Sequence, residues 1–219
     1  MSFISDSEDG HMSSTTMSTE NTIEKSAALK DKGNLVVIGN GMVGHHFVER
    51  AIEQGLHEQF EIHVFAEEDR PAYDRVYLSS YFEHKDASKL NLVDLTTYES
   101  SQITLHLNQR IVAIDSLNQS ITTEAGEQID YSELVLATGS YPFVPPIAGR
   151  EHPHCHVYRT IADLDEILAI AELPNVKKGV VVGGGLLGLE AAKALVTLGL
   201  DTYVVEFAPQ LMGVQLDAS

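Results

Sequence analysis

Gly39-Asn40-Gly41-Met42-Val43-Gly44 is the stretch that decides the fold of this 219-residue chain. It follows the apolar run 35–38 and opens an amphipathic segment, so a strand, a glycine turn and a helix follow one another, as at the start of a dinucleotide-binding βαβ unit. In such a unit Gly39 permits the tight turn, Gly41 lets the backbone approach a pyrophosphate, and Gly44 lets the helix pack closely on the strand. The first turn of the helix then offers free N–H groups to the phosphates.

The residues that follow support this motif, which is weak by itself. Gly55 lies where the helix should end. Five apolar residues at helical spacing form one predicted buried face: Val43, Phe47, Val48, Ala51 and Ile52. A strand over 62–65 then ends at Glu67 and Glu68, where an acid can accept hydrogen bonds from an adenosine ribose. The alternative, a structural glycine turn with a surface acidic pair, explains these features less well.

A second fingerprint, Gly183-Gly184-Gly185-Leu186-Leu187-Gly188, repeats the arrangement in the last third of the chain. It follows a strand over 179–182 that we predict to be buried, and it opens a helix over 186–198 that Gly199 caps. The next strand, 202–205, ends at Glu206. This carboxylate would bond the ribose diol of a nicotinamide cofactor and would repel a 2′-phosphate, so NADH is preferred over NADPH.

The composition limits the classes of partner. With 14 basic and 32 acidic residues the net charge is −18, which argues against a nucleic-acid partner or an anionic membrane surface. No apolar run has membrane-spanning length. The single cysteine, Cys155, excludes an internal disulfide and a four-cysteine metal site. Residues 1–32 are rich in Ser, Thr and acids and have no features of a secretory or mitochondrial signal, so we expect a disordered tail and a cytoplasmic location.

The middle of the chain has a different pattern. The runs 103–107, 110–115, 120–123 and 128–131 alternate or are rich in β-branched residues, which predicts a meander of short antiparallel strands. They lead into Leu134-Val135-Leu136-Ala137, an unbroken apolar run typical of a strand that is buried on both faces.

Three further features have two interpretations each. The tract His152-Pro153-His154-Cys155-His156 has zinc-ligand composition, but Pro153 stiffens it, and a solvated loop is favoured. Thr160 and Asp163 resemble a capping box ahead of a helix over 164–173, so Asp163 is a cap rather than a catalyst. Arg75 either bonds cofactor phosphates or forms a surface pair with Asp74, and spacing alone does not choose.

Two complete fingerprints suggest that one cofactor passes electrons to another. The chain resembles the two-dinucleotide flavoprotein oxidoreductases, and among them the N-terminal part of the large subunit of NADH-dependent nitrite reductase. The resemblance extends over about residues 34–216. The segments that carry it are 39–45, 73–82, 137–142, 157–161, 183–190 and 205–209.

The resemblance implies a role for each site residue. The implied FAD residues are Gly39, Asn40, Gly41, Met42 and Gly44 of the first fingerprint, Glu67 at the ribose, Arg75 at the phosphates, Ile111 at the adenine, and Ala137, Thr138 and Gly139 in a second FAD motif. The implied NADH residues are Gly183, Gly185, Leu186, Leu187, Gly188, Glu190 and Glu206. A hydride would pass from nicotinamide to flavin, and no side chain need act as a nucleophile, base or metal ligand.

The resemblance also implies an organisation. The expected fold is α/β: a Rossmann-like FAD-binding domain over 33–150 with an antiparallel β-meander, then a linker and the start of a second Rossmann-like, NADH-binding domain over 151–219. Siroheme and an iron–sulfur cluster are implied only in a further downstream part. Our hypothesis is therefore a truncated chain whose electrons go to downstream metal domains or to a small electron-transfer protein. The oligomeric state, a homodimer included, stays open.

Two alternatives remain at this level. Relatives that reduce disulfides carry a cysteine pair, and some oxidases carry one cysteine near the position of Ser79 or Ser80, but this chain has neither. Ferredoxin and rubredoxin reductases often carry a lysine where this chain has Ser80, which favours the nitrite reductase branch. The front part of an NADH-dependent ferredoxin or rubredoxin reductase is the second interpretation. A non-catalytic nucleotide-binding remnant is the third.

Overall fold

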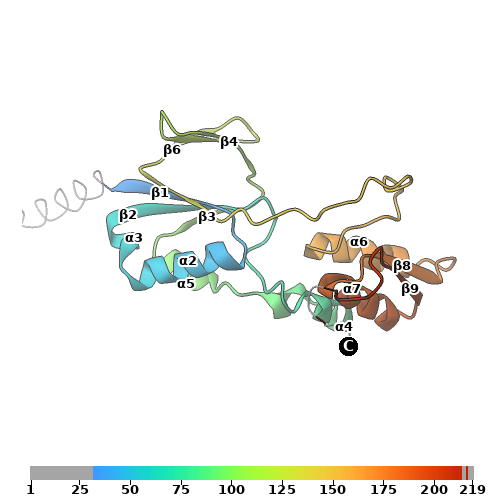
Figure 1. Ribbon diagram of the computed structural model, residues 1–219. Helices are drawn as coiled ribbons and strands as arrows, with labels where there is room; N and C mark the ends of the chain where they lie inside the picture. The colour runs from blue at the N-terminus through green and yellow to red at the C-terminus, as the bar shows by residue number, and fades with distance from the viewer. Residues whose placement is uncertain (1–31, 214–215, 217–219) are drawn as a thin grey trace, which may run out of the picture.

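The computed structural model describes residues 32–213 and residue 216. The predicted tail over 1–32 therefore lies outside the described residues, apart from Lys32. Figure 1 shows a sheet with its helices and a meander at one end, and helices α4, α6 and α7 with strands β8 and β9 at the other. None of the described helices has both the length and the apolar character needed to cross a membrane.

A four-stranded parallel sheet forms the first unit. Its order is β3 (Thr104–His106), β2 (Phe60–Phe65), β1 (Gly33–Ile38) and β7 (Glu133–Leu136). Helix α2 (Met42–Glu53) and the short α3 (Leu56–Gln59) connect β1 to β2. The register places Ile38 opposite both Phe65 and Leu136, so three strands end at one edge. Ligands of parallel α/β sheets bind at such an edge.

The two faces of this sheet are covered differently (Figure 1). Helices α2 and α5 (Leu95–Ser100) cover one face, where Val37, Val64 and Val48 are fully buried. The meander covers the other face with β4 (Ile111–Asp115), β5 (Ser120–Thr123) and β6 (Gln128–Asp130). Ile121 of β5 is fully buried against the sheet. Because burial of apolar surface is the main favourable term in folding, these two layers hold the strand ends in place.

The predicted meander is wrong at its first strand. Residues 104–106 pair in parallel with β2 rather than with β4, and the carbonyl of His106 accepts the N–H of Ala66 at 2.8 Å. Alternation of apolar and polar residues marks a half-buried strand but does not identify its neighbour. Helix α5 delivers the chain to the free edge of β2, so the meander has three strands.

Two burial predictions are also wrong. Leu136 is 60% exposed, because β7 is an edge strand of the described sheet and pairs only with β1 there. Val43 is 74% exposed, because it lies in the first turn of α2 at the open end of the sheet. The buried face of α2 instead includes His45, whose Nδ1 lies 3.1 Å from the Tyr98 hydroxyl.

The second unit has a parallel pair of strands, β8 (Lys178–Val182) and β9 (Asp201–Val205), joined by α7 (Leu186–Thr197). We expected β8 to be buried, but Val180 and Val182 are 60% and 59% exposed. Helix α7 covers only one side of the pair, so one set of side chains faces outward. Gly199 adopts φ +81 after α7, and its N–H donates a hydrogen bond to the carbonyl oxygen of Val196. This geometry confirms the predicted cap.

Helix α6 (Ile161–Ala171) begins three residues before the predicted start. Thr160 accepts the N–H of Asp163 at 3.2 Å, and Asp163 accepts the N–H of Thr160 at 2.7 Å. The capping box is confirmed, with Thr160 itself as the N-cap.

The segment 78–90, which comes after β2 along the chain, packs on the second unit. It contains η1 (Leu78–Ser80), α4 (Tyr81–His84) and η2 (Ala87–Leu90). Its apolar side chains share one buried cluster with Ile161, Leu164 and Ala194 of α6 and α7. This cluster connects the two units directly, in addition to the extended chain between β7 and α6.

A histidine pair on the meander side of the sheet makes stability depend on pH. Nδ1 of His63 lies 3.1 Å from Nε2 of His106, whose ring stacks on Phe65. Burial lowers the pKa of both histidines, against the smaller opposing effects of Glu61 and Glu127. The unfolded chain therefore binds protons more readily, so we expect full stability above about pH 6.5 and a loss as pH falls below it.

Urea unfolding at pH 7.5 and pH 5.5 measures this effect. The double variant His63→Gln/His106→Gln should lose less stability between the two values than the native chain. An equal loss in both proteins would assign the pH dependence to other groups.

Candidate functional site

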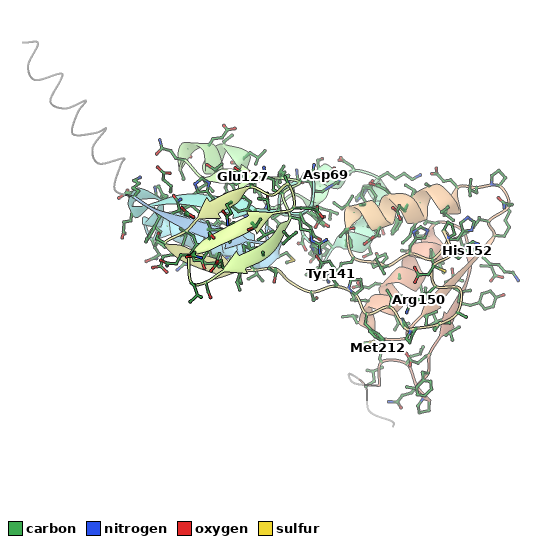
Figure 2. The ribbon with its side chains drawn as sticks, turned by 90° about the horizontal axis from the view of Figure 1, so that it is seen from above. Asp69, Glu127, Tyr141, Arg150, His152 and Met212 are labelled. Carbon is green, nitrogen blue, oxygen red and sulfur yellow. The ribbon has the colours of Figure 1, made fainter. Side chains whose placement is uncertain are left out.

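A cavity of about 650 Å³ opens where β1, β2 and β7 end. Its lining comes from four places: the first fingerprint, the residues after β2, the chain 136–142 at the end of β7, and four residues around the start of α6, namely Val157, Arg159, Thr160 and Asp163. Tyr141, labelled in Figure 2, lies on this lining, between the sheet and the helices of the second unit. A concave site at the carboxyl ends of parallel strands is the usual position for a ligand.

The glycines of the first fingerprint have the geometry that the motif requires. Gly39 adopts φ +107, and a Cβ there would lie 2.2 Å from the carbonyl oxygen of Ala137. A Cβ on Gly44 would lie 1.9 Å from the carbonyl oxygen of Gly39. A Cβ on Gly41 would meet no heavy atom within 4 Å among the residues that the structure describes. Two glycines therefore allow close packing, and the third faces open space, where a ligand can approach the backbone.

The second fingerprint has a similar geometry, although a Cβ on Gly183, unlike one on Gly39, would meet no described heavy atom within 4 Å. Gly183 adopts φ +113, and a Cβ on Gly188 would lie 2.0 Å from the Gly183 carbonyl oxygen. A Cβ on Gly185 would again meet no heavy atom of the described chain within 4 Å. Leu186 and Leu187, in the first turn of α7, are exposed. The chain thus has two backbone cradles of one design, and the 650 Å³ cavity lies at the first.

The acidic residues after β2 have different partners. The Glu67 carboxylate accepts a hydrogen bond from the Tyr141 hydroxyl at 2.8 Å and lies 3.7 Å from Nε of Arg110. Glu68 instead pairs with Arg75. The alternative pairing of Arg75 with Asp74 is wrong, because the Asp74 carboxylate accepts backbone N–H groups of the next turn. Arg75, held by Glu68, is one of the residues that line the cavity.

The acid after β9 is held by backbone groups. Glu206 accepts the N–H of Ala208 at 2.7 Å and the N–H of Gly184 at 2.6 Å. These hydrogen bonds lower the pKa of the Glu206 carboxyl. An ionised carboxylate therefore lies beside the second cradle, where it can accept hydrogen bonds from the two hydroxyl groups of a ribose. Glu190 is half-buried on α7.

Two residues that line the 650 Å³ cavity have side-chain polar groups without a partner among the described residues. Asn40 is only 9% exposed, and neither polar atom of its amide meets a hydrogen-bond partner within the described residues. A buried polar group without a partner costs about 1–3 kcal/mol, so this amide suits a site that receives a polar ligand. Arg159 lines the cavity near Gly139, and no carboxylate of the described chain lies within ion-pair distance of it.

Arg159 is a candidate that sequence reasoning missed. It stands in the segment 157–161 that carried the family resemblance, but no spacing rule connects it with the glycines. Three arginines line the cavity: Arg70, which pairs with Asp69, and Arg75 and Arg159. Arg75 and Arg159, together with the N–H groups at the start of α2, can receive an anionic ligand. These features fit the diphosphate of a dinucleotide.

The remaining predicted FAD residues divide into two groups. Met42, Ala137, Thr138 and Gly139 line the cavity, and Gly139 adopts φ +72. Ile111 is not among the lining residues. It begins β4 and packs partly buried against the cluster under the meander.

The histidine tract does not form a metal centre in the described part of the chain, where no group of three or more His, Cys, Asp or Glu side chains could hold an ion. His156 lies 3.0 Å from Glu166, and His152 accepts the backbone N–H of His154. Figure 2 shows His152 at the outer end of the molecule, away from the cavity at Tyr141.

Comparison with known proteins places these features in context. Residues 33–219 match the family described as pyridine nucleotide-disulphide oxidoreductase. The nitrite reductase [NAD(P)H] large subunit of Klebsiella oxytoca is 51% identical over 183 residues, which are 84% of this chain and 19% of that protein. The assimilatory nitrate reductase electron transfer subunit of Bacillus subtilis (strain 168) is 36% identical over 189 residues, 85% of this chain and 24% of that protein.

Among solved structures, a ferredoxin reductase from Rhodopseudomonas palustris superposes with a TM-score of 0.73 at 26% identity. The match covers 85% of this chain and 46% of that chain. The chain spans about a fifth of the length of the curated nitrite reductases it matches.

Proposed function

Because the chain belongs to the pyridine nucleotide-disulphide oxidoreductase family, we propose that it is the FAD- and NADH-binding module of an NADH-dependent nitrite reductase. The observation that carries the proposal is the pair of matching glycine cradles, the first of which opens into the 650 Å³ cavity. The 51% identity with the Klebsiella oxytoca large subunit supports the choice within the family.

The first cradle is assigned to FAD. Gly39, Gly41 and Gly44 shape the backbone that faces the diphosphate, and the start of α2 supplies N–H groups. Arg75 and Arg159 supply positive charge, and the Glu67 carboxylate accepts hydrogen bonds from the ribose. When bound, FAD supplies the two-electron redox chemistry, while this chain binds and orients it.

The second cradle is assigned to NADH. Its glycines leave room for the diphosphate in front of Gly185, and the ionised Glu206 suits a ribose with two free hydroxyl groups. Two cofactors held by one chain allow hydride transfer between them without a catalytic side chain.

The electrons would leave this module for a metal centre. In a nitrite reductase the acceptors are a siroheme and an iron–sulfur cluster, which nitrite reduction to ammonia would require in a further part of the protein. The relatives, a nitrite reductase large subunit and an electron transfer subunit, support an acceptor domain or protein of this kind. The match to a ferredoxin reductase supports a second candidate, transfer to a small iron–sulfur protein.

A spectrum of the purified chain tests the central proposal. We expect yellow protein with flavin absorption that NADH bleaches under anaerobic conditions. Colourless protein that cannot be loaded with FAD, or a bound flavin that NADH does not reduce, would contradict it. Adding oxidised ferredoxin or rubredoxin as acceptor then distinguishes the second candidate from the first.

The Glu67→Ala variant tests the ribose assignment. Loss of hydrogen bonds to a charged acceptor should weaken FAD binding by about 1.5–3 kcal/mol. Flavin fluorescence during titration with FAD gives the dissociation constant. Glu61→Ala, on β2 but outside the cavity lining, is the control that should keep native affinity.

The Glu206→Arg variant tests the nicotinamide assignment. The native carboxylate repels a 2′-phosphate, whereas an arginine would attract it, so preference should shift toward NADPH by about one order of magnitude or more. The measurement is the ratio of the dissociation constants for NADH and NADPH. An unchanged ratio would mean that Glu206 does not read the ribose.

A further inference from the structure

Glu68, Tyr73 and Arg75 form a connected group on the cavity wall. Glu68 follows β2, the other two lie on the loop before η1, and all three line the cavity. The Glu68 carboxylate accepts a hydrogen bond from Nη2 of Arg75 through Oε1. Its Oε2 accepts one from the Tyr73 hydroxyl at 2.8 Å. Both carboxylate oxygens are therefore held by protein groups.

Tyr73 holds Arg75 from a second direction. The guanidinium carbon of Arg75 lies 5.1 Å from the centroid of the Tyr73 ring, within range of a cation–π contact. Tyr73 is only 2% exposed, and its hydroxyl oxygen also accepts the N–H of Ile161 at 3.3 Å. Burial raises the pKa of the Tyr73 hydroxyl well above its usual value, so the group stays a neutral donor to Glu68.

The arginine keeps donors for a ligand. A guanidinium has five N–H groups in a rigid planar fork. Within the described residues, Nη2 to Glu68 is the one hydrogen bond of the Arg75 side chain, which is 26% exposed. The opposite side of the fork can therefore bind an anion in the cavity while Glu68 fixes its orientation.

We propose that Glu68 and Tyr73 are positioning residues, which hold the Arg75 guanidinium so that its free N–H groups face the diphosphate of the bound dinucleotide. The inference rests on the proposed function, and it gives Glu68 a role different from that of its neighbour Glu67. A carboxylate beside a diphosphate would by its charge alone weaken binding. Positioning and simple repulsion therefore predict opposite effects when the charge of Glu68 is removed.

The Glu68→Gln variant separates these two accounts. Because the arginine loses its charged partner, FAD affinity should fall about 10-fold in Glu68→Gln and about three-fold in Tyr73→Phe. In an Arg75→Gln background, Glu68→Gln should cause no further loss, since it acts through Arg75. Glu53→Gln is the matched control: this carboxylate pairs with Arg50 on α2, and neither residue lines the cavity, so affinity should stay native.

Two results would overturn the proposal. Native or tighter FAD binding by Glu68→Gln would mean that the carboxylate only repels the phosphates. An equal loss in both backgrounds would mean that Glu68 contacts the cofactor itself or only supports the fold.

A measurement without ligand keeps this inference separate from the flavin assignment. In ¹⁵N-labelled protein, the guanidinium signals of Arg75, identified by their loss in Arg75→Gln, report rotation about the Nε–Cζ bond. We expect slow rotation in the native chain and faster rotation in Glu68→Gln. Equal rotation in both proteins would overturn the positioning role. Slow rotation in a native chain that binds no FAD would support the positioning of Arg75 by Glu68 and would contradict the assignment of FAD to the cavity.

Discussion

The Gly44→Ala variant should lose about 3 kcal/mol of unfolding free energy or more, because the added methyl group meets a backbone atom that cannot move independently. The new Cβ would lie 1.9 Å from the carbonyl oxygen of Gly39, which itself adopts φ +107. Relief requires α2 to move away from β1, and this opens the core between them. The usual gain of about 1 kcal/mol from alanine in a helix does not offset this cost. Urea unfolding followed by circular dichroism measures the change.

The matched control lies three residues earlier. A Cβ on Gly41 meets no heavy atom within 4 Å, so Gly41→Ala should change stability by less than about 1 kcal/mol. The same methyl group would stand where the diphosphate approaches the backbone, so FAD binding should weaken although the fold is kept. Equal stability losses in the two variants would contradict this account of the cradle.

The Arg75→Gln variant should lose about 100-fold in FAD affinity, equivalent to about 2.7 kcal/mol, because charge-assisted bonds to phosphate are among the strongest hydrogen bonds in proteins. Arg75 lies on the wall of a cavity and is largely shielded from solvent by Tyr73 and Glu68, so salt screens the interaction less than at an open surface. Flavin fluorescence gives the dissociation constant, and a titration with ADP reports the diphosphate contact without the flavin.

Arg50→Gln is the control for the loss of one positive charge. Arg50 lies on the outer side of α2, is paired with Glu53, and does not line the cavity. The FAD affinity of the Arg50→Gln variant should stay within about two-fold of native, since only long-range, screened charge effects remain. Equal losses at Arg50 and Arg75 would attribute the effect to net charge and not to a contact.

Much of the fold could be predicted because it depends on local pattern. The strands that lead into each fingerprint, the helices after them, the cap at Gly199 and the box at Thr160 all follow from neighbours in sequence. The wrong predictions concern which elements lie next to one another. The run 103–107 was assigned to the meander but forms the parallel edge strand β3. The apolar runs 134–137 and 179–182 are predicted to be buried, but Leu136, Val180 and Val182 are exposed. An apolar run indicates a strand, whereas its burial depends on which elements cover it.

The candidate site shows the same division. The glycines were recognisable because a close approach of the backbone to a diphosphate demands them at fixed spacing, and the acid after each second strand because a ribose demands an acceptor there. Arg159 was not recognisable, because no spacing rule connects it with the glycines. The partner of Arg75 was not recognisable either, because Asp74 and Glu68 are both near it in the sequence.

The amino-acid sequence alone determined the two dinucleotide cradles and the family, because both are properties of short stretches in which each residue acts on its neighbours. The tertiary structure decided which charges face the first cavity: it paired Arg75 with Glu68 and brought Arg159 to Gly139. Those contacts join residues that are far apart or that compete for several partners, and only the packing of whole elements selects among them.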